Sequence, residues 1–314
     1  MKHVAIVGAS GHIGSSLAAA IAGRAGMRVD LYSRRPEATR ARALHWRERR
    51  LIAADLVHRP IEALDFKGCD VVVNALGLGS PARIAAAGRS VLALTLDWEE
   101  RMRAALGQCP DALYIYLSSG AVYGPLVEGA ATAASTASLA INSLEPADAY
   151  GRAKFMAETM HRGWSHGRVL DVRVFGYVSG EIGLDEAFFA AQMFKALVAG
   201  AVFHTGAHDM VRDYVGPEEL LALIEAAAAT AELNEAVDIY SMRPVGKFEL
   251  MAALQLLGLR YEVSTAPSPP PARLKYFTTF DRAASLGYVP ARTSTEVVVD
   301  AARQVLALAR EAAA

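Results

Sequence analysis

Short apolar runs separated by helical patterns recur through the first half of the chain. "HVAIV" at 3–7, "DVVVNAL" at 70–76 and "DALYIYLSS" at 111–119 are apolar runs of strand length. "MRVDLY", "RLIAADL" and "RVLDVRVF" are further runs of this kind, and helical patterns lie between them, for example at 90–106 and 149–164. Short buried strands that alternate with helices predict an α/β fold, a Rossmann-type doubly wound parallel sheet.

This regularity fades after residue 175. We therefore expect a sheet domain at 1–175 and a smaller C-terminal substrate-binding lobe at 176–314, some segments of which return to the first domain. Helices are expected near 185–199, 217–230, 247–257 and 294–312, with a strand at 237–242. The proline-rich stretch 265–274 predicts a loop, because proline cannot occupy the interior of a helix or a central strand.

Composition narrows the classes of function. The 314 residues carry a formal net charge of −1, which argues against a nucleic-acid partner. No apolar run approaches the roughly 18 residues of a membrane span, and the first residues lack an apolar leader, so we expect a cytoplasmic protein without a membrane partner. The two cysteines form no spacing motif, and Gly206 interrupts any helix that would align His204 with His208, so we expect no metal site.

A glycine-rich loop follows the first apolar run. "GASGHIG" places Gly8, Gly11 and Gly14 between a strand and a helix, with Ser10, His12 and Ile13 among them. Glycines there allow a tight turn and let backbone amides approach a pyrophosphate at the positive end of a helix. Because a strand precedes the loop and a helix follows it, the loop predicts dinucleotide binding.

The end of the second strand bears on the choice of dinucleotide. An acidic residue there takes the ribose 2′-hydroxyl of NAD, whereas arginine accommodates the 2′-phosphate of NADP. In "DLYSRRP", Ser33 stands at the acidic position and is followed by Arg34 and Arg35, while Asp30 lies inside the strand. These arginines either bind the phosphate or solvate a helix start. We favour NADP, with NAD as the alternative.

Two polar motifs carry candidate chemistry. In "DAYGRAKFMAE", Tyr150 and Lys154 are four residues apart and share one helical face. An ammonium beside a phenol favours the phenolate and makes the tyrosine a usable acid or base. In "LSSGAVYG", Ser118 and Ser119 end a strand, where they either cap the next helix or present a hydroxyl to a site at the carboxyl end of the sheet.

Six motifs occur in one order: "GASGHIG", "AADL", "NALGLG", "LSSGAVYG", "YGRAK" and "RDYVGPEEL". Together they resemble the extended short-chain dehydrogenase/reductase family, and more narrowly its NAD-dependent epimerase/dehydratase branch, which acts on nucleotide sugars. The resemblance runs from Val4 to about Pro290. It implies that Ser119 bonds the substrate oxygen, Tyr150 exchanges the proton, and Lys154 holds the cofactor ribose and lowers the tyrosine pKa.

The same resemblance implies further binding residues. Asp55 and Leu56 of "AADL" would meet the adenine, and Arg212 would reach the nucleotide-sugar diphosphate, with Arg273 as a weaker candidate. The pyrophosphate side would be lined by Asn74, Ala75, Leu76 and Gly77. The family also pairs the helices at 90–107 and 149–164 into a homodimer, and both segments carry apolar stripes.

Some positions depart from the family pattern. Gly120 and Ala121 replace the Asp-Glu pair of the dehydratases, so 4,6-dehydration lacks its acid and base. Gly176 replaces a substrate-binding asparagine, and Gly216 replaces a histidine. The substrate is therefore expected to differ from UDP-galactose. Because Arg34 and Arg35 favour NADPH, the cofactor that cells use for reduction, we expect an NAD(P)-dependent oxidoreductase that reduces the 4-keto group of a nucleotide sugar. The alternatives are a 4-epimerase with tightly held NAD and a non-catalytic NADP-binding regulator.

Overall fold

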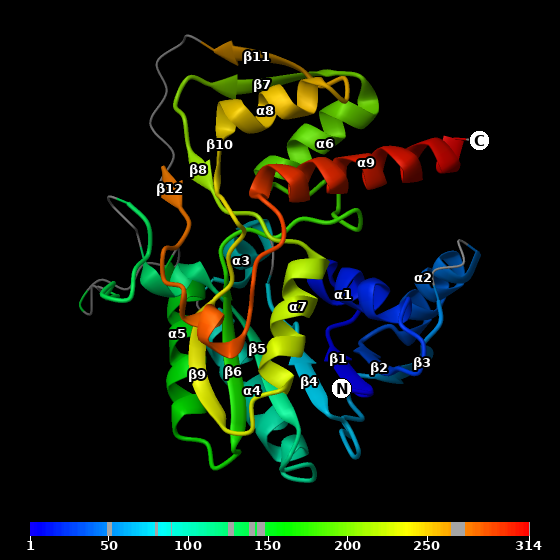
Figure 1. Ribbon diagram of the computed structural model, residues 1–314, viewed down its shortest axis with the longest axis vertical. Helices are drawn as coiled ribbons and strands as arrows, with labels where there is room; N and C mark the ends of the chain where they lie inside the picture. The colour runs from blue at the N-terminus through cyan, green and yellow to red at the C-terminus, as the bar shows by residue number, and fades with distance from the viewer. Residues whose placement is uncertain are drawn as a thin grey trace.

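Seven parallel strands form the central sheet of the protein, seen here in a computed structural model (Figure 1). Their spatial order is β3 (Asp55–Pro60), β2 (Arg28–Ser33), β1 (His3–Val7), β4 (Val71–Asn74), β5 (Leu113–Ser119), β6 (Arg168–Val174) and β9 (Leu233–Asp238). The structure describes residues 1–48, 52–78, 81–88, 90–124, 129–137, 142, 148–264 and 274–313, without the side chains of 81–83, 312 and 313. The predicted Rossmann-type sheet is confirmed.

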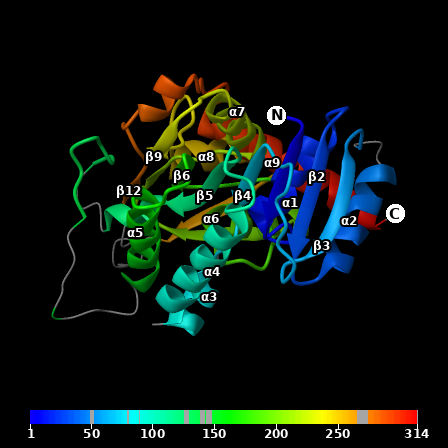
Figure 2. The same ribbon diagram turned by 90° about the horizontal axis from the view of Figure 1, so that it is seen from below.

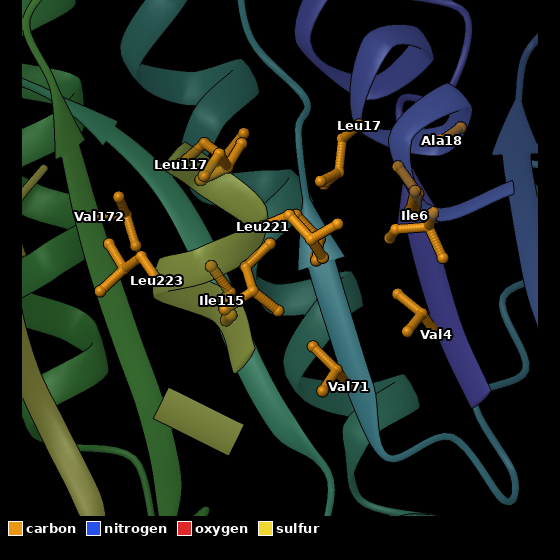
Figure 3. Packing of buried hydrophobic residues seen from close by; sticks show 14 of the residues in the cluster. Val4, Ile6, Leu17, Ala18, Val71, Ile115, Leu117, Val172, Leu221 and Leu223 are labelled. Atoms are coloured by element: carbon orange, nitrogen blue, oxygen red, sulfur yellow. The ribbon is translucent and has the colours of Figure 1, made fainter. Parts of the chain in front are cut away.

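Helices cover both faces of the sheet (Figure 2). Successive strand residues point to opposite faces, and because the strands carry apolar residues on both, each face needs cover from water. On β1, Val4 and Ile6 pack in the core under α1 (His12–Ala22), α2 (Pro36–Glu48) and α7 (Pro217–Ala228), as Figure 3 shows for α1 and α7. Ala5 and Val7 belong to the opposite core, beneath α4 (Ser90–Leu106) and α5 (Ala149–Arg162). The short helix α3 (Pro81–Ala87) precedes α4.

Two strands begin or end where the sequence pattern did not predict. The third strand, expected at 50–56, begins only at Asp55, because the amides of Ala53 and Ala54 donate to the Ala22 carbonyl at the end of α1. The strand expected at 237–242 is β9, which ends at Asp238. Beyond it the Ser241 amide donates to the Asp213 carboxylate instead of a sheet partner.

Residues after 175 contribute to both parts of the molecule. α7 and β9 return to the sheet, where β9 pairs with β6 and α7 packs in the main core. A second core joins α6 (Phe189–Ala199), α8 (Lys247–Gln255) and α9 (Ser294–Ala313). Small sheets complete this lobe: β7 (Val202–Gly206) with β11 (Arg260–Ser264), and β10 (Val245–Gly246), β8 (Val211–Arg212) and β12 (Lys275–Tyr276).

The lobe stands above the carboxyl ends of the strands (Figure 1). β1 lies between β2 and β4, so the chain winds outward from it in both directions, and the crevice at such a point is where open α/β sheets bind ligands. Within the described part of the chain, no helix combines the length and the apolar character that a bilayer span requires.

Candidate active site

A cleft of about 1410 Å³ separates the strand ends from the lobe. It brings together most of the residues that the motifs singled out. The predicted site residues on its wall are Ser10, Gly11, His12, Ile13, Ala75, Leu76, Gly77, Ser119, Tyr150, Lys154 and Arg212.

The glycine loop at one end of the cleft fits a pyrophosphate. Gly8 has φ +90°, and a Cβ there would lie 2.9 Å from the Ala75 carbonyl oxygen. A Cβ on Gly14 would lie 2.4 Å from the Gly8 carbonyl oxygen, so no side chain fits at that point. α1 begins at His12 with Gly11 as its N-cap, and within the part of the chain that the structure describes no side chain caps its first amides. These amides and the positive end of the helix suit an anion.

Asn74 shapes the next segment of the wall from behind. Its buried amide group donates to Glu99 Oε1 and to the Tyr114 hydroxyl, both at 2.9 Å. Its Oδ1 accepts from the Leu76 amide at 3.0 Å, which fixes the turn that carries Gly77. The side chain of Asn74 therefore supports this part of the cleft wall and is itself fully buried.

The two serines at the end of β5 have different roles. Ser118 Oγ donates to Glu158 Oε1 at 2.5 Å, and the same carboxylate accepts from Arg173, so Ser118 is part of a buried network. Ser119 Oγ accepts from the Ala121 amide at 3.2 Å. Both serines line the cleft, but Ser119 Oγ is not tied to a carboxylate as Ser118 Oγ is. Ser119 therefore both caps the 3₁₀ turn η1 (Gly120–Tyr123) and presents its hydroxyl to the site.

Tyr150 lies opposite Ser119 because α5 approaches η1 closely. A Cβ on Gly151 would lie 2.5 Å from the Ala121 carbonyl oxygen, so only glycine allows this approach. Burial raises the pKa of Tyr150 to about 12, the Tyr276 phenol adds to this, and an interaction with the Ser119 hydroxyl works in the opposite direction. Tyr150 is therefore a neutral phenol across the physiological pH range.

Lys154 is buried beside the same hydroxyls. Its Nζ donates to the Leu117 carbonyl at 2.7 Å and lies 4.2 Å from the centre of the Tyr116 ring. Burial lowers the pKa of Lys154 to about 8, against the opposing effect of the Glu99, Glu158 and Asp171 carboxylates. The predicted lowering of the tyrosine pKa is wrong for this arrangement, because Nζ points to Leu117 and stays 5.8 Å from the Tyr150 ring centre.

The residues predicted for the adenosine end lie away from the cleft. Ser33 is 1% exposed and its hydroxyl is enclosed, while Arg34 and Arg35 are exposed and absent from the cleft wall. Asp55 and Leu56 begin β3, level with the first residues of β2. The cleft lies at the opposite, carboxyl ends of the strands, so the structure does not bring Asp55 and Leu56 to it.

The lobe supplies the other wall. Arg212 lines it, half-buried, and its Nη1 donates to the Val211 carbonyl at 2.9 Å. α6 begins at the cleft with Phe188 as its N-cap, and no side chain of the described residues caps its first amides. Arg273, the weaker candidate, lies outside the described residues.

Sequence reasoning did not single out several polar residues of the cleft wall, among them Arg42, Arg152, Glu181 and Tyr276. The Tyr276 hydroxyl lies 3.4 Å from Ser119 Oγ, across 157 residues of sequence. No local pattern marks such a contact. Arg152 pairs with Asp148 at 3.0 Å. Because it lies inside "YGRAK", two residues after Tyr150, the motif could have indicated Arg152 as a residue of the cleft.

Packing explains two departures from the family pattern. A Cβ on Gly120 would lie 2.6 Å from the Phe175 ring, so the acidic residue of the dehydratases would clash there. A Cβ on Gly176 would lie 2.5 Å from the Asp213 carbonyl oxygen and 3.0 Å from the Tyr214 ring. The lobe therefore fills the space that an asparagine would need at this position.

The protein thus has an α/β fold in which a glycine loop and a group of two hydroxyls and a buried lysine share one cleft. The chain belongs to the NAD dependent epimerase/dehydratase family, whose family model matches residues 4–242. No curated protein sequence matches it significantly.

Solved structures share the fold over nearly the whole chain. A UDP-glucose 4-epimerase from Stenotrophomonas maltophila with bound NAD has a TM-score of 0.80 at 16% identity, covering 100% of this chain and 99% of the other. A UDP-glucuronic acid 4-epimerase from Bacillus cereus, in complex with UDP-glucuronic acid and NAD, has a TM-score of 0.71 at 15% identity, covering 98% and 99%. A UDP-glucose 4-epimerase from Thermotoga maritima with UDP-glucose has a TM-score of 0.72 at 18% identity, covering 99% of this chain and 100% of the other. At these identities the similarity concerns the fold.

Proposed function

We propose that the protein is an NAD(P)-dependent oxidoreductase that reduces the 4-keto group of a nucleotide sugar. The observation that carries this proposal is the convergence of Ser119, Tyr150 and Lys154 at one end of a cleft whose other end is the glycine loop. Two hydroxyls and an amine beside a dinucleotide cradle suit hydride and proton transfer at a carbonyl carbon.

The dinucleotide would lie along the strand ends. Its pyrophosphate would be held by the amides of the glycine loop at the start of α1, and Lys154, next to Gly77, would reach its ribose hydroxyls. When bound, NADPH would supply the hydride.

The chain's own residues would move the proton. With a pKa raised to about 12, Tyr150 is protonated at neutral pH and is therefore a donor, which is what a carbonyl oxygen needs as it becomes a hydroxyl. Ser119 would orient that oxygen through its hydroxyl.

The lobe would recognise the nucleotide diphosphate. The uncapped start of α6 offers free amides and a positive helix end, and Arg212 adds a guanidinium on the same wall. Similar solved structures hold UDP-glucose and UDP-glucuronic acid, which supports a nucleotide sugar as the ligand class.

A 4-epimerase with tightly held NAD is the second candidate. It is favoured by the solved structures of similar fold, several of which are 4-epimerases with bound NAD. To separate the two, the purified protein is incubated with UDP- and dTDP-sugars without added cofactor. Interconversion of two epimers would overturn the reductase proposal, whereas consumption of added NADPH, one for each 4-keto group, would support it. Dinucleotide binding with no turnover would indicate a regulator.

We also propose a homodimer formed through α4 and α5. These helices lie side by side on one face of the sheet (Figure 2) and leave Leu94, Phe155 and Met156 exposed. Large apolar side chains on neighbouring helices suit a four-helix interface. Light scattering at micromolar concentration is expected to give twice the chain mass, and a monomer would contradict the proposal.

A further inference from the structure

The end of the cleft away from Tyr150 has its own pair of charged side chains. Tyr150 and Ser119 lie on the β5 side of β1, so a dinucleotide with its nicotinamide there must extend its adenosine half toward β2 and α2. On that side, the described cleft wall carries Arg42 from α2 and Glu181 from the loop after β6.

Arg42 is held at the glycine loop itself. Its Nη1 donates to the Ser10 carbonyl at 3.0 Å, and its Nε lies 3.8 Å from Glu181 Oε2. The two side chains are 39% and 25% exposed. A partly exposed pair at this distance is weak, so a stronger anion can replace the carboxylate as the partner of the guanidinium.

Hydrogen bonds with α2 and within its own loop hold Glu181 in position, and the loop in turn contacts the start of α1. Glu181 Oε1 accepts from Trp46 Nε1 at 3.3 Å, one turn beyond Arg42 on the same helix. Its amide donates to Ser179 Oγ at 3.2 Å, and Ser179 Oγ lies 2.9 Å from His12 Nε2 at the start of α1. Burial and the Arg42 charge lower the pKa of His12 to about 4, so His12 adds no positive charge here.

The end of β2 offers less to an adenosine ribose. The Ser33 hydroxyl is enclosed, and the exposed side chains of Arg34 and Arg35 lie outside the cleft wall. The charges that the cleft presents to this ribose therefore come from α2 and the loop after β6.

We propose that Arg42 and Glu181, rather than Arg34 and Arg35, set the preference between NADP and NAD. The Arg42 fork binds the 2′-phosphate of NADP, which displaces the Glu181 carboxylate. Glu181 opposes this by competing for the guanidinium and by repelling the phosphate, and it accepts from the 2′-hydroxyl of NAD. This inference rests on the proposed dinucleotide binding and adds the residues that discriminate between the two cofactors.

The test is a fluorescence titration of NADPH and NADH into the purified protein and four variants. Arg42→Gln is expected to weaken NADPH binding about tenfold, the loss of a charge-assisted contact to phosphate, and to change NADH binding less than about threefold. Glu181→Gln is expected to raise the affinity for NADPH relative to NADH by about threefold or more. Arg42→Lys keeps the charge without the fork and is expected to fall between wild type and Arg42→Gln.

The matched control is the double variant Arg34→Gln with Arg35→Gln, which removes two guanidinium groups from the same region. It is expected to leave the NADPH-to-NADH ratio within about twofold of wild type, because exposed charges outside the cleft are screened. A shifted ratio in this control, together with an unchanged ratio in Arg42→Gln, would overturn the inference alone. Failure of the wild-type protein to bind either dinucleotide would overturn the proposed function as well.

Discussion

The two ends of the cleft are built in different ways. At the proposed catalytic end, Ser119 comes from β5 and both Tyr150 and Lys154 come from α5, where Lys154 is buried and bonded to a backbone carbonyl. At the proposed adenosine end, Arg42 and Glu181 come from segments far apart along the chain, are partly exposed, and meet at 3.8 Å. The catalytic end is held by buried contacts, and the adenosine end by a weak ion pair.

This difference indicates where substitutions act. Substitutions at the buried end change polar groups that are shielded from water and bonded to protein partners. They are therefore expected to lower turnover or the free energy of unfolding. Changes at the partly exposed end alter which charge a ligand meets, so their effect falls on the choice of dinucleotide. The following predictions test this separation.

The largest effect is expected from Tyr150→Phe, which removes the proton donor and keeps the ring. Turnover is expected to fall about 10²-fold or more, the usual contribution of a positioned acid–base group. NADPH affinity is expected to stay within about threefold, since the variant leaves the glycine loop untouched. Loss of binding in parallel with turnover would contradict the separation.

The paired serines give the next effect. Ser119→Ala is expected to lower turnover about tenfold, the value of one hydrogen bond to the reacting oxygen. Ser118→Ala is the matched control: turnover is expected to stay within about threefold, while the free energy of unfolding falls by about 1–3 kcal/mol as Glu158 loses a buried donor. Steady-state kinetics and urea unfolding measure both. Equal kinetic losses would show that the serine assignments are wrong.

Gly14→Ala affects the glycine loop, to which Arg42 is bonded through the Ser10 carbonyl. The added Cβ would lie 2.4 Å from the Gly8 carbonyl oxygen, so the cradle must shift. NADPH and NADH binding are expected to weaken together by about tenfold, unlike the selective effect at Arg42. Gly167→Ala, at a position where a Cβ meets nothing within 4 Å, is the control and is expected to bind as wild type. A selective loss of one dinucleotide in Gly14→Ala would count against the assignment of this loop to the pyrophosphate.

The smallest effect concerns the network beneath the catalytic end. His161 Nδ1 lies 2.6 Å from Asp171 Oδ1 and its Nε2 3.0 Å from Glu99 Oε2. Burial acts to lower the pKa of His161, but the hydrogen bonds that its ring donates to the two carboxylates outweigh burial and raise the pKa from 6.5 to about 9. A raised pKa in the folded state stabilises the protein fully below pH 6.5, and this contribution is lost as the pH rises through 9.

The unfolding free energy of wild type, relative to His161→Gln, is therefore expected to fall by about 1–3 kcal/mol between pH 6.5 and 9. Urea titrations at a series of pH values measure this difference. A difference that grows with pH would show that the histidine is neutral in the fold.

The sequence predicted what local pattern determines. The apolar runs located the strands of the sheet, and the glycine loop and "YGRAK" located the two ends of the cleft, because each depends on neighbours a few residues away. Asp55 was misplaced because Ala53 and Ala54 bond the end of α1, a contact across the fold. Arg42, Glu181 and Tyr276 were missed for the same reason, since their positions depend on long-range packing.

The most direct test of the proposed reaction follows the hydride itself. The purified protein is mixed with UDP- or dTDP-4-keto-hexoses and NADPH deuterated at the transferable position, and the sugar is examined by NMR. The account predicts deuterium at C4, one for each NADPH consumed, and a loss of about 10²-fold in the rate with Tyr150→Phe. Bound NADPH that is never consumed, with no deuterium in any of these sugars, would contradict it.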